Sequence, residues 1–322
     1  KELLEDSVKK RMIADVPVGA FLSGGLDSSA ITSIMRKHSI PQTYSMGFDV
    51  HQYDELSEAE TVANLFETHH SSLTVSCNTF QYLDELVRMF DEPFADNSTI
   101  PTLMVSSMAA KNVKVVLSGD GADELFLGYR NYRLLNLDNN LKQRFPASIR
   151  TPLFRFLTKC YPTIPWAPQF LRAKSTFQAV LHDSITNFHQ AMSLNSAEIL
   201  TSLFTEDFLS QFKRSPSLER FQLLASEASM LDSVKQAQYI DFKTYLPGNI
   251  LTKVDRTSMA NSIEVRVPFL DHRLVEKMLP ITSEQNIGFR NSKKILRTIV
   301  EDKLPKRIIE RKKQSFTSPM DE

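Results

Sequence analysis

Residues 23–29 (Ser-Gly-Gly-Leu-Asp-Ser-Ser) bring two glycines, three hydroxyls and one carboxylate together between two structured patterns. The apolar run at 18–22 predicts a short buried strand, and residues 30–37 predict a helix. Glycine lets the backbone approach a cluster of oxygens closely, and a helix N-terminus favours negative charge. The stretch therefore predicts a phosphate-binding loop. It has neither the Gly-Lys-Ser/Thr ending of nucleoside triphosphatases nor the Gly-x-Gly-x-x-Gly spacing of dinucleotide-binding proteins.

A second loop, residues 118–124 (Ser-Gly-Asp-Gly-Ala-Asp-Glu), repeats this design after the apolar run at 113–117. Three carboxylates within five residues, close to a phosphate loop, are typical of a magnesium site, because hard cations take carboxylate and phosphate oxygens. The carboxylate of Asp27 also indicates a cation, because phosphates repel a carboxylate unless a cation lies between them. Helix capping by aspartate would explain either loop without any chemistry. The presence of both loops favours ATP phosphates and Mg2+.

The elements around these loops alternate over residues 1–130. Strands are predicted at 43–48 and 70–75 in addition to the two before the loops, and helices at 2–12, 54–67, 79–90 and 99–111. Strands separated by helices predict an α/β fold with a parallel twisted sheet flanked by helices. Ligands of such sheets collect beyond the carboxyl ends of the strands. That rule selects residues 23–29, 46–49 and 118–124.

The second half of the chain shows no strand pattern beyond Tyr129 and predicts a mainly helical second lobe. We divide the chain into an ATP-binding core at 1–131, a helical lobe at 132–244, and a segment at 245–322 that returns to the active-site cleft. Residues 139–182 contain no Asp or Glu and mix basic with aromatic residues. Either they bind an anionic partner or they form helices that cover a core, and the second interpretation is favoured because arginine stems readily cover apolar surface.

Overall composition limits the class of protein. Lys plus Arg number 38 and Asp plus Glu number 38, so no global charge recruits nucleic acid or an anionic membrane. No apolar run approaches the roughly 20 residues of a membrane span, and no secretory signal opens the sequence. Cys77 and Cys160 belong to no Cys-x-x-Cys pair and are expected to be reduced and buried in a cytoplasmic protein.

Further motifs accompany the two loops: Asp-Glu-Pro-Phe-Ala-Asp at 91–96, Gly-Tyr at 128–129, Lys-Val-Asp-Arg-Thr-Ser-Met-Ala at 253–260, Glu-Val-Arg-Val-Pro-Phe-Leu-Asp-His at 264–272 and Arg-Lys-Lys-Gln-Ser-Phe at 311–316. In order and spacing, the whole set resembles the synthetase domain of glutamine-hydrolysing asparagine synthetases. These enzymes belong to the ATP-pyrophosphatase (PP-loop) group, whose fold is of the adenine nucleotide alpha-hydrolase type. The resemblance spans residues 1 to 319 and is weakest at 132–240.

The resemblance implies roles for individual residues. ATP would be bound by Leu22, Ser23, Gly24, Gly25, Leu26, Asp27, Ser28, Met46, Gly47, Ser118 and Gly119. Asp27 and Asp123 would hold Mg2+. The catalytic residues would be Lys313, which neutralises charge on the α-phosphate, and Asp120, which takes a proton from ammonia. The candidates for substrate binding are Asp96, Glu124, Tyr129, Arg256, Glu264 and Arg266.

The reaction implied by the resemblance is the adenylation of the side-chain carboxylate of aspartate by ATP, followed by attack of ammonia to give asparagine, AMP and pyrophosphate. Relatives usually carry glutamate where this chain has Asp120, which pulls the carboxylate back by about one methylene. An enzyme that forms an acyl-adenylate of another acid, as β-lactam-forming relatives do, therefore stays open. A more distant alternative is a nucleotide-binding module without turnover.

The resemblance also implies partners. Relatives carry an N-terminal glutaminase domain that begins with a cysteine nucleophile, and the present sequence starts after the point where that domain would end. We therefore expect a glutaminase domain in the full-length protein, with aspartate and ammonia as the small-molecule substrates. No nucleic acid or membrane partner is expected, and a homodimer stays open.

Overall fold

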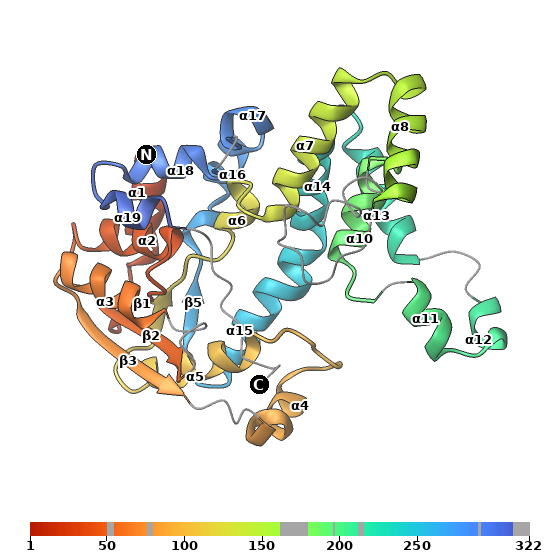
Figure 1. Cartoon of the computed structure of the whole chain (residues 1–322). Coiled ribbons are helices and arrows are strands. Elements are labelled where there is room, and N and C mark those ends of the chain that lie inside the picture. Colours follow the sequence, from red (N-terminus) through yellow and green to blue (C-terminus); the bar gives the residue numbers. More distant parts are fainter. Residues whose placement is uncertain are drawn as a thin grey trace. The chain divides into compact units, whose positions relative to one another are not determined.

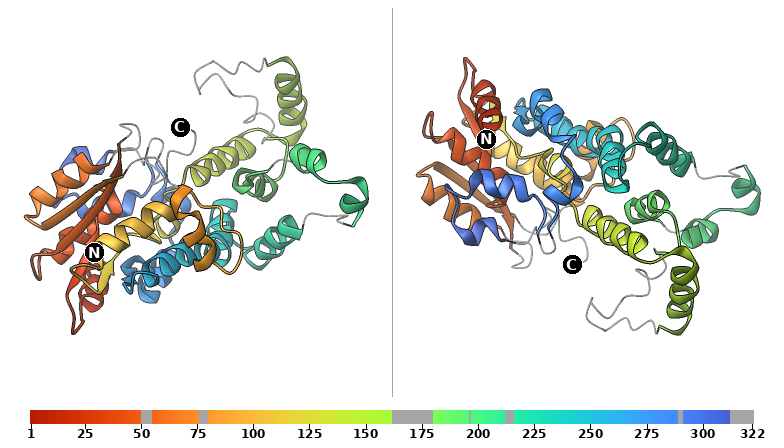
Figure 2. Two further views of the ribbon diagram at one scale, coloured as in Figure 1. Left: turned by 90° about the horizontal axis from the view of Figure 1, so that it is seen from below. Right: turned by 90° about the horizontal axis from the view of Figure 1, so that it is seen from above.

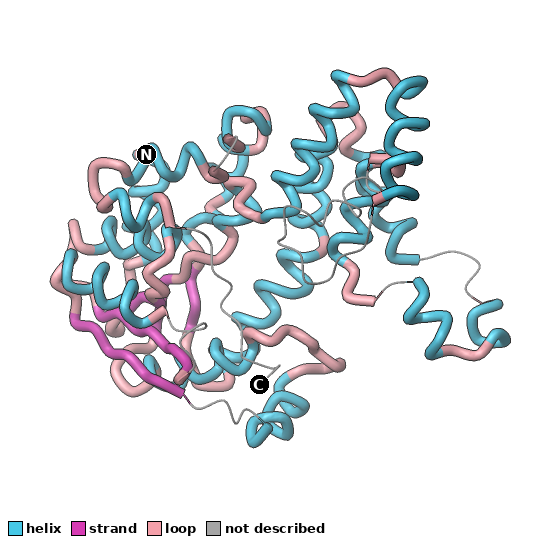
Figure 3. The backbone as a smooth tube through the Cα atoms, in the orientation of Figure 1, coloured by secondary structure: helices cyan, strands magenta, loops and turns pink. Residues whose placement is uncertain are grey.

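The computed structural model describes residues 1–49, 55–75, 80–161, 180–195, 197–211, 216–288 and 291–311. The chain forms two compact units. The first, here called the α/β unit, contains Lys1–Phe126, Thr244–Ile281 and Gly288–Glu322; the second, the helical unit, contains Leu127–Lys243 and Thr282–Ile287. Every strand among the described residues lies in the α/β unit (Figures 1 and 3). The three-part division made from the sequence stays a prediction.

The sheet of the α/β unit has five strands in the order β3-β2-β1-β4-β5, and all neighbouring pairs are parallel. The strands are β1 (Val18–Phe21), β2 (Gln42–Phe48), β3 (His69–Val75), β4 (Val115–Leu117) and β5 (Glu264–Arg266). Because β1 pairs with both β2 and β4, the loops that follow these three strands lie along one edge of the sheet. The predicted parallel α/β fold is confirmed.

Strand β5 corrects the sequence analysis, which found no strand pattern beyond Tyr129. Its three residues pair with Val115–Leu117 of β4, yet none of the three is buried. Two of them, Glu264 and Arg266, are charged. An edge strand of three residues with exposed charged side chains carries no apolar alternation, which is why the pattern missed it.

Helices cover both faces of the sheet, and in Figure 2 the strands lie between α3 (orange) and α5 (yellow). Strand β2 is buried from its second residue onward, as expected for a strand covered on both faces. Its side chains Tyr44, Met46 and Phe48 join Val105 and Ala109 of α5 in one apolar cluster. The helical elements of this unit are α1 (Glu2–Arg11), α2 (Leu26–Met35), α3 (Leu56–Leu65), η2 (Phe80–Tyr82), α4 (Leu83–Met89), α5 (Thr99–Ala109), α6 (Ala122–Leu125), η4 (Leu246–Leu251), α15 (Thr252–Met259), η5 (Pro268–Leu270), α16 (His272–Met278), α18 (Lys294–Val300) and α19 (Lys306–Ile309).

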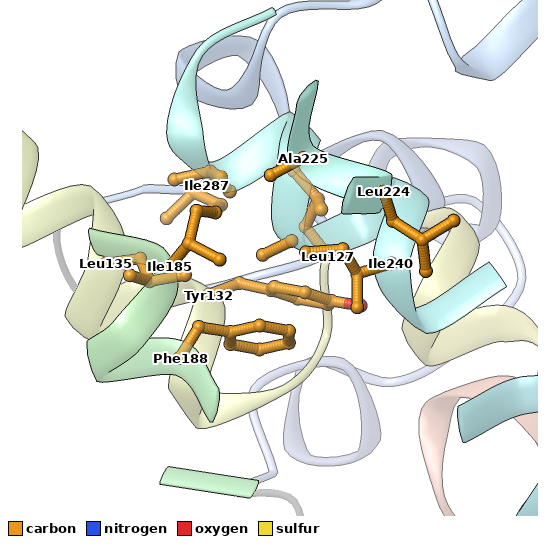
Figure 4. Packing of buried hydrophobic residues seen from close by; sticks show 11 residues of the cluster. Leu127, Tyr132, Leu135, Ile185, Phe188, Leu224, Ala225, Ile240 and Ile287 are labelled. Atoms are coloured by element: carbon orange, nitrogen blue, oxygen red, sulfur yellow. The ribbon is translucent and has the colours of Figure 1, made fainter. Parts of the chain in front are cut away.

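The helical unit packs around two aromatic rings, those of Tyr132 and Phe188, whose centroids lie 6.3 Å apart (Figure 4). The Tyr132 hydroxyl donates a hydrogen bond to the carboxylate of Asp241, so the buried polar end of the ring is satisfied. Cys160 is a free, exposed thiol, contrary to its predicted burial, because it ends a helix with no buried residue among those described. The helices are α7 (Arg130–Arg144), α8 (Ala147–Cys160), α10 (Ser184–Met192), α11 (Ala197–Leu203), α12 (Glu206–Ser210), α13 (Pro216–Glu227), α14 (Ser233–Lys243) and α17 (Ser283–Asn286).

Across the described parts of both units, we find no helix with the length and apolar character needed to cross a membrane.

Candidate active site

The first glycine loop connects β1 to α2 and has the geometry of an anion-binding turn. Gly24 has φ +67°, and a Cβ added there would lie 2.5 Å from the backbone carbon of Glu58, so both the conformation and the space require glycine. Gly25 is the N-cap of α2, whose N-terminus therefore opens at the loop. The hydroxyls of Ser23 and Ser28 lie 3.1 Å apart, and Ser28 Oγ also accepts a hydrogen bond from the Ser23 amide at 3.2 Å. The loop thus presents amides and hydroxyls at a helix start.

The second glycine loop lies directly against the first, because β4 is the neighbour of β1. A Cβ added to Gly119 would lie 3.0 Å from Cβ of Asp27 and 3.1 Å from the amide nitrogen of Ser28. Only glycine allows this close approach without a shift of the loop. Within the second loop, Ser118 Oγ donates a hydrogen bond to the carboxylate of Asp120, which fixes the direction of that side chain. The two predicted loops therefore form one site.

Lys293 joins the two loops. Its Nζ lies 2.6 Å from the carboxylate of Asp27 and 2.8 Å from that of Asp123, and the lysine side chain is only 7% exposed. Burial opposes the charge of this ammonium, but Asp123 and Asp27 outweigh burial and raise the pKa of Lys293. Lys293 itself adopts a left-handed conformation, with φ +56°, at the start of α18. The sequence analysis missed this residue.

The two carboxylates predicted to hold Mg2+ are close neighbours, because both lie within hydrogen-bond distance of one nitrogen. Magnesium in nucleotide sites takes one or two protein carboxylates and completes its shell with phosphate oxygens and water. Asp27 and Asp123 fit that donor set. No cluster of three or more His, Cys, Asp or Glu ligands occurs among the described residues.

The residues predicted to contact the nucleotide base lie at the carboxyl ends of β1 and β2. Leu22 is buried, and its amide donates to the carbonyl of Tyr44 at 2.9 Å. The Met46 side chain belongs to the apolar core, and both Met46 and Gly47 are buried in β2. A role in reading adenine through backbone groups stays a prediction for this segment.

A charged cluster lies behind the first loop. Arg311 donates to the carbonyl oxygen of Ser23 at 3.4 Å and pairs with the carboxylates of Glu55 at 3.2 Å and Glu58 at 3.8 Å. Its side chain is 17% exposed, and Glu55 is 8% exposed. The sequence analysis treated Arg311 only as part of a basic motif. Lys313, the predicted catalytic lysine, lies outside the described residues.

Asp96 lies in a second polar cluster of the α/β unit, between α4 and α5. Its carboxylate accepts a hydrogen bond from Asn249 at 2.7 Å and lies 3.5 Å from Lys253 Nζ, which donates to Ser98 Oγ at 2.6 Å. Burial alone would raise the pKa of Asp96, but Lys253, Ser98 and Asn249 lower it below its usual range. Helices α5 and α15 each lead into the start of the next strand, β4 and β5. The first turn of each helix therefore lies at the carboxyl edge of the sheet, and this cluster lies there with them.

The other substrate candidates are dispersed. Arg256 pairs with the exposed carboxylate of Asp91. Arg266 pairs with Glu264 at 2.7 Å and donates to two carbonyl oxygens at the end of α1 and just after it, which gives both residues structural contacts. Glu124 is buried in α6, and Tyr129 packs against the core of the helical unit. The structure thus brings Asp27, Ser28, Gly119 and Asp123 together, and a substrate role for the five dispersed candidates stays a prediction.

The parallel five-stranded sheet flanked by helices defines an α/β protein, and its two glycine loops, two carboxylates and bridging lysine lie together at the carboxyl ends of neighbouring strands. Comparison with known families identifies the family to which this α/β protein belongs. The sequence model of the Asparagine synthase family matches residues 1–322, and the chain belongs to that family.

Two curated relatives match 99% of this chain. Asparagine synthetase [glutamine-hydrolyzing] 1 of Bacillus subtilis is 33% identical over 325 residues, which cover 49% of that protein. A putative asparagine synthetase [glutamine-hydrolyzing] of Mycobacterium tuberculosis is 36% identical over 328 residues, or 47% of its length. A putative asparagine synthetase [glutamine-hydrolyzing] 2 of Methanocaldococcus jannaschii is 48% identical over 136 residues, 41% of this chain and 26% of that protein. The chain spans about half the length of the relatives that it matches from end to end.

Proposed function

We propose that the chain catalyses ATP-dependent amide formation: it adenylates the side-chain carboxylate of aspartate and transfers ammonia to it, giving asparagine, AMP and pyrophosphate. The observation that carries this proposal is the meeting of the two glycine loops, with Lys293 between Asp27 and Asp123. A site that only bound a nucleotide would not need two carboxylates beside the phosphates, because they repel phosphate unless a metal is present.

The phosphate side of the reaction belongs to the first loop. Its amides and the hydroxyls of Ser23 and Ser28 would bind the β- and γ-phosphates at the start of α2. Asp27 and Asp123 would hold Mg2+, which when bound neutralises charge on the leaving pyrophosphate. Lys293 would stay beside the same oxygens as a second positive charge, since its buried amine cannot move into solvent without breaking both ion pairs.

The acyl side belongs to the second loop and its surroundings. Asp120, held by Ser118, would accept the proton that ammonia loses as it attacks the acyl-adenylate. Asp96, ionised beside Lys253, would accept a hydrogen bond from the α-amino group of the amino-acid substrate. Lys313 would neutralise charge on the α-phosphate, a role that rests on its match to the family motif.

Ammonia supply is the remaining part of the proposal. The two relatives that match 99% of this chain are named as glutamine-hydrolysing enzymes, and the chain covers about half of the length of each. We infer that a glutaminase domain delivers ammonia in the full-length protein. Residues 1–322 alone would use free ammonia and would not hydrolyse glutamine.

The test is exchange of labelled pyrophosphate into ATP, with aspartate, other amino acids or no acid, followed by assay of AMP and asparagine after ammonium is added. Aspartate should support exchange, Asp27→Asn should abolish it, and Asp84→Asn, an exposed carboxylate on α4, should not change it. Asp120→Asn should retain exchange but lose amide formation, because the base acts only in the second step. Exchange with another acid but not aspartate would replace the substrate, and ATP binding with no exchange for any acid would refute a catalytic role.

A further inference from the structure

The first loop rests on the first turn of α3, which carries two carboxylates. Gly24 touches the backbone of Glu58, and Glu55 and Glu58 lie at and just after the start of that helix. Both side chains are partly or wholly withdrawn from water, at 8% and 22% exposed. A loop that accepts several phosphate charges therefore has two negative charges directly behind it. Such charges oppose anion binding because little solvent screens them.

Arg311 is the cation at this position. One of its guanidinium nitrogens approaches the carbonyl oxygen of Ser23, and another approaches the carboxylates of Glu55 and Glu58. Although burial opposes ionisation of Glu58, the hydrogen bond from Ser57 and the charge of Arg311 lower the pKa of Glu58, so the carboxylate is ionised at neutral pH. The guanidinium fork is suited to hold two carboxylates and one carbonyl in a fixed geometry.

We propose that Arg311 is a positioning residue for triphosphate binding: it offsets one of the two negative charges of Glu55 and Glu58 behind the loop and fixes the loop backbone at Ser23. This inference rests on the proposed binding of ATP. It gives the first arginine of the segment 311–316 a function of its own, separate from the role predicted for Lys313. The arginine acts through the loop and does not need to touch the nucleotide.

Loss of Arg311 should weaken binding more for a ligand with more phosphate charge. Arg311→Met should raise the Kd for ATP·Mg2+ at least tenfold, which corresponds to about 1.4 kcal/mol. The Kd for AMP, which lacks the two terminal phosphates, should change less than about threefold. A change that simply loosened the fold would weaken both ligands together. Arg311→Lys keeps the charge and should stay within about threefold of the wild type for ATP.

The deciding variant removes the carboxylates as well. In Glu55→Gln/Glu58→Gln/Arg311→Met both carboxylates are removed together with the guanidinium, so no uncompensated negative charge stands behind the loop and the Kd for ATP should return to within about threefold of the wild type. The matched control is Arg307→Met, because Arg307 lies 3.9 Å from the same Glu58 carboxylate but is 70% exposed. Its Kd for ATP should change less than about twofold, as expected for an exposed pair.

Isothermal titration calorimetry with ATP·Mg2+ and with AMP, on the full 322-residue chain, measures these constants. Wild-type affinity in Arg311→Met overturns the inference, and so does a triple variant as weak as Arg311→Met, since Arg311 would then bind phosphate itself. If Arg311→Met does not fold, Glu55→Gln/Glu58→Gln decides: it should bind ATP at least as tightly as the wild type, and weaker binding overturns the inference. A wild type that binds ATP but forms no asparagine refutes only the proposed function.

Discussion

Replacement of Lys293 by methionine tests the central feature of the site. The substitution keeps a side chain of similar length but removes the cation between Asp27 and Asp123. The carboxylate oxygens approach the same nitrogen to 2.6 and 2.8 Å, so without it two negative charges face each other about 5 Å apart. At an effective dielectric constant of about 20 their repulsion is about 3 kcal/mol. That agrees with the roughly 3–5 kcal/mol lost when one partner of a buried ion pair is removed.

The assay is urea unfolding at pH 7 in EDTA, followed by circular dichroism, with hydrogen exchange of peptides from residues 18–35 to assign the transition to the α/β unit. Lys293→Met should lose about 3 kcal/mol of unfolding free energy. Lys294→Met is the matched control, because Lys294 is the adjacent lysine and is exposed. Its unfolding free energy should stay within about 0.5 kcal/mol of the wild type.

Magnesium provides the second measurement. Without the ammonium of Lys293 the two carboxylates should bind Mg2+ more tightly in the absence of nucleotide, and 10 mM Mg2+ with a Kd of about 1 mM would restore about 1.4 kcal/mol. The wild type should respond less, because Lys293 already offsets the charge of both carboxylates. Sodium chloride at equal ionic strength separates binding from screening. A Lys293→Met variant as stable as the wild type, or one that responds to sodium and magnesium alike, would refute the reasoning.

Three further predictions concern single side chains. Burial lowers the pKa of Lys235 to about 8, below the unfolded value near 10.5. The buried charge therefore destabilises the fold below pH 8, and this effect disappears as pH rises past 10.5. Lys235→Met should raise the free energy of unfolding in urea by about 2 kcal/mol at pH 7 and by little at pH 10.5. Gly24→Ala should cost more than about 2 kcal/mol in thermal unfolding, whereas Gly25→Ala, with φ −75° and a nearest contact of 3.2 Å, should cost under about 1 kcal/mol. Tyr132→Phe should cost about 2 kcal/mol in the same assay, because the buried carboxylate of Asp241 loses its donor.

Features encoded within a few neighbouring residues could be predicted from the sequence. Both loops follow an apolar strand and carry glycine where the backbone needs it, at Gly24 with φ +67° and at Gly121 with φ +80°. The strand patterns at 43–48 and 113–117 alternate with helix patterns, and this alternation led to the parallel sheet, whose strands β2 and β4 are buried almost throughout. Neighbouring strands then bring the two loops together without further information.

Features that depend on contacts between distant segments could not be predicted. Lys293 meets Asp27 across 266 positions of sequence, and Arg311 meets Glu55 across 256. Neither lysine nor arginine is distinguished locally, since each sits among other basic residues, Lys294 in one case and Lys312 in the other. Only the fold shows which of them points into the α/β unit.

The number of carboxylates around the site is a sequence feature that could have predicted these cations. The loops and the start of α3 place four buried or half-buried carboxylates, Asp27, Glu55, Glu58 and Asp123, around one proposed phosphate site. Buried carboxylates require nearby cations in the absence of a ligand, because desolvation is not otherwise repaid. A sequence that commits several carboxylates to one phosphate loop therefore predicts that cations from elsewhere in the chain meet them. Here two basic side chains from the last 30 residues, Lys293 and Arg311, meet that requirement, one in front of the loop and one behind it.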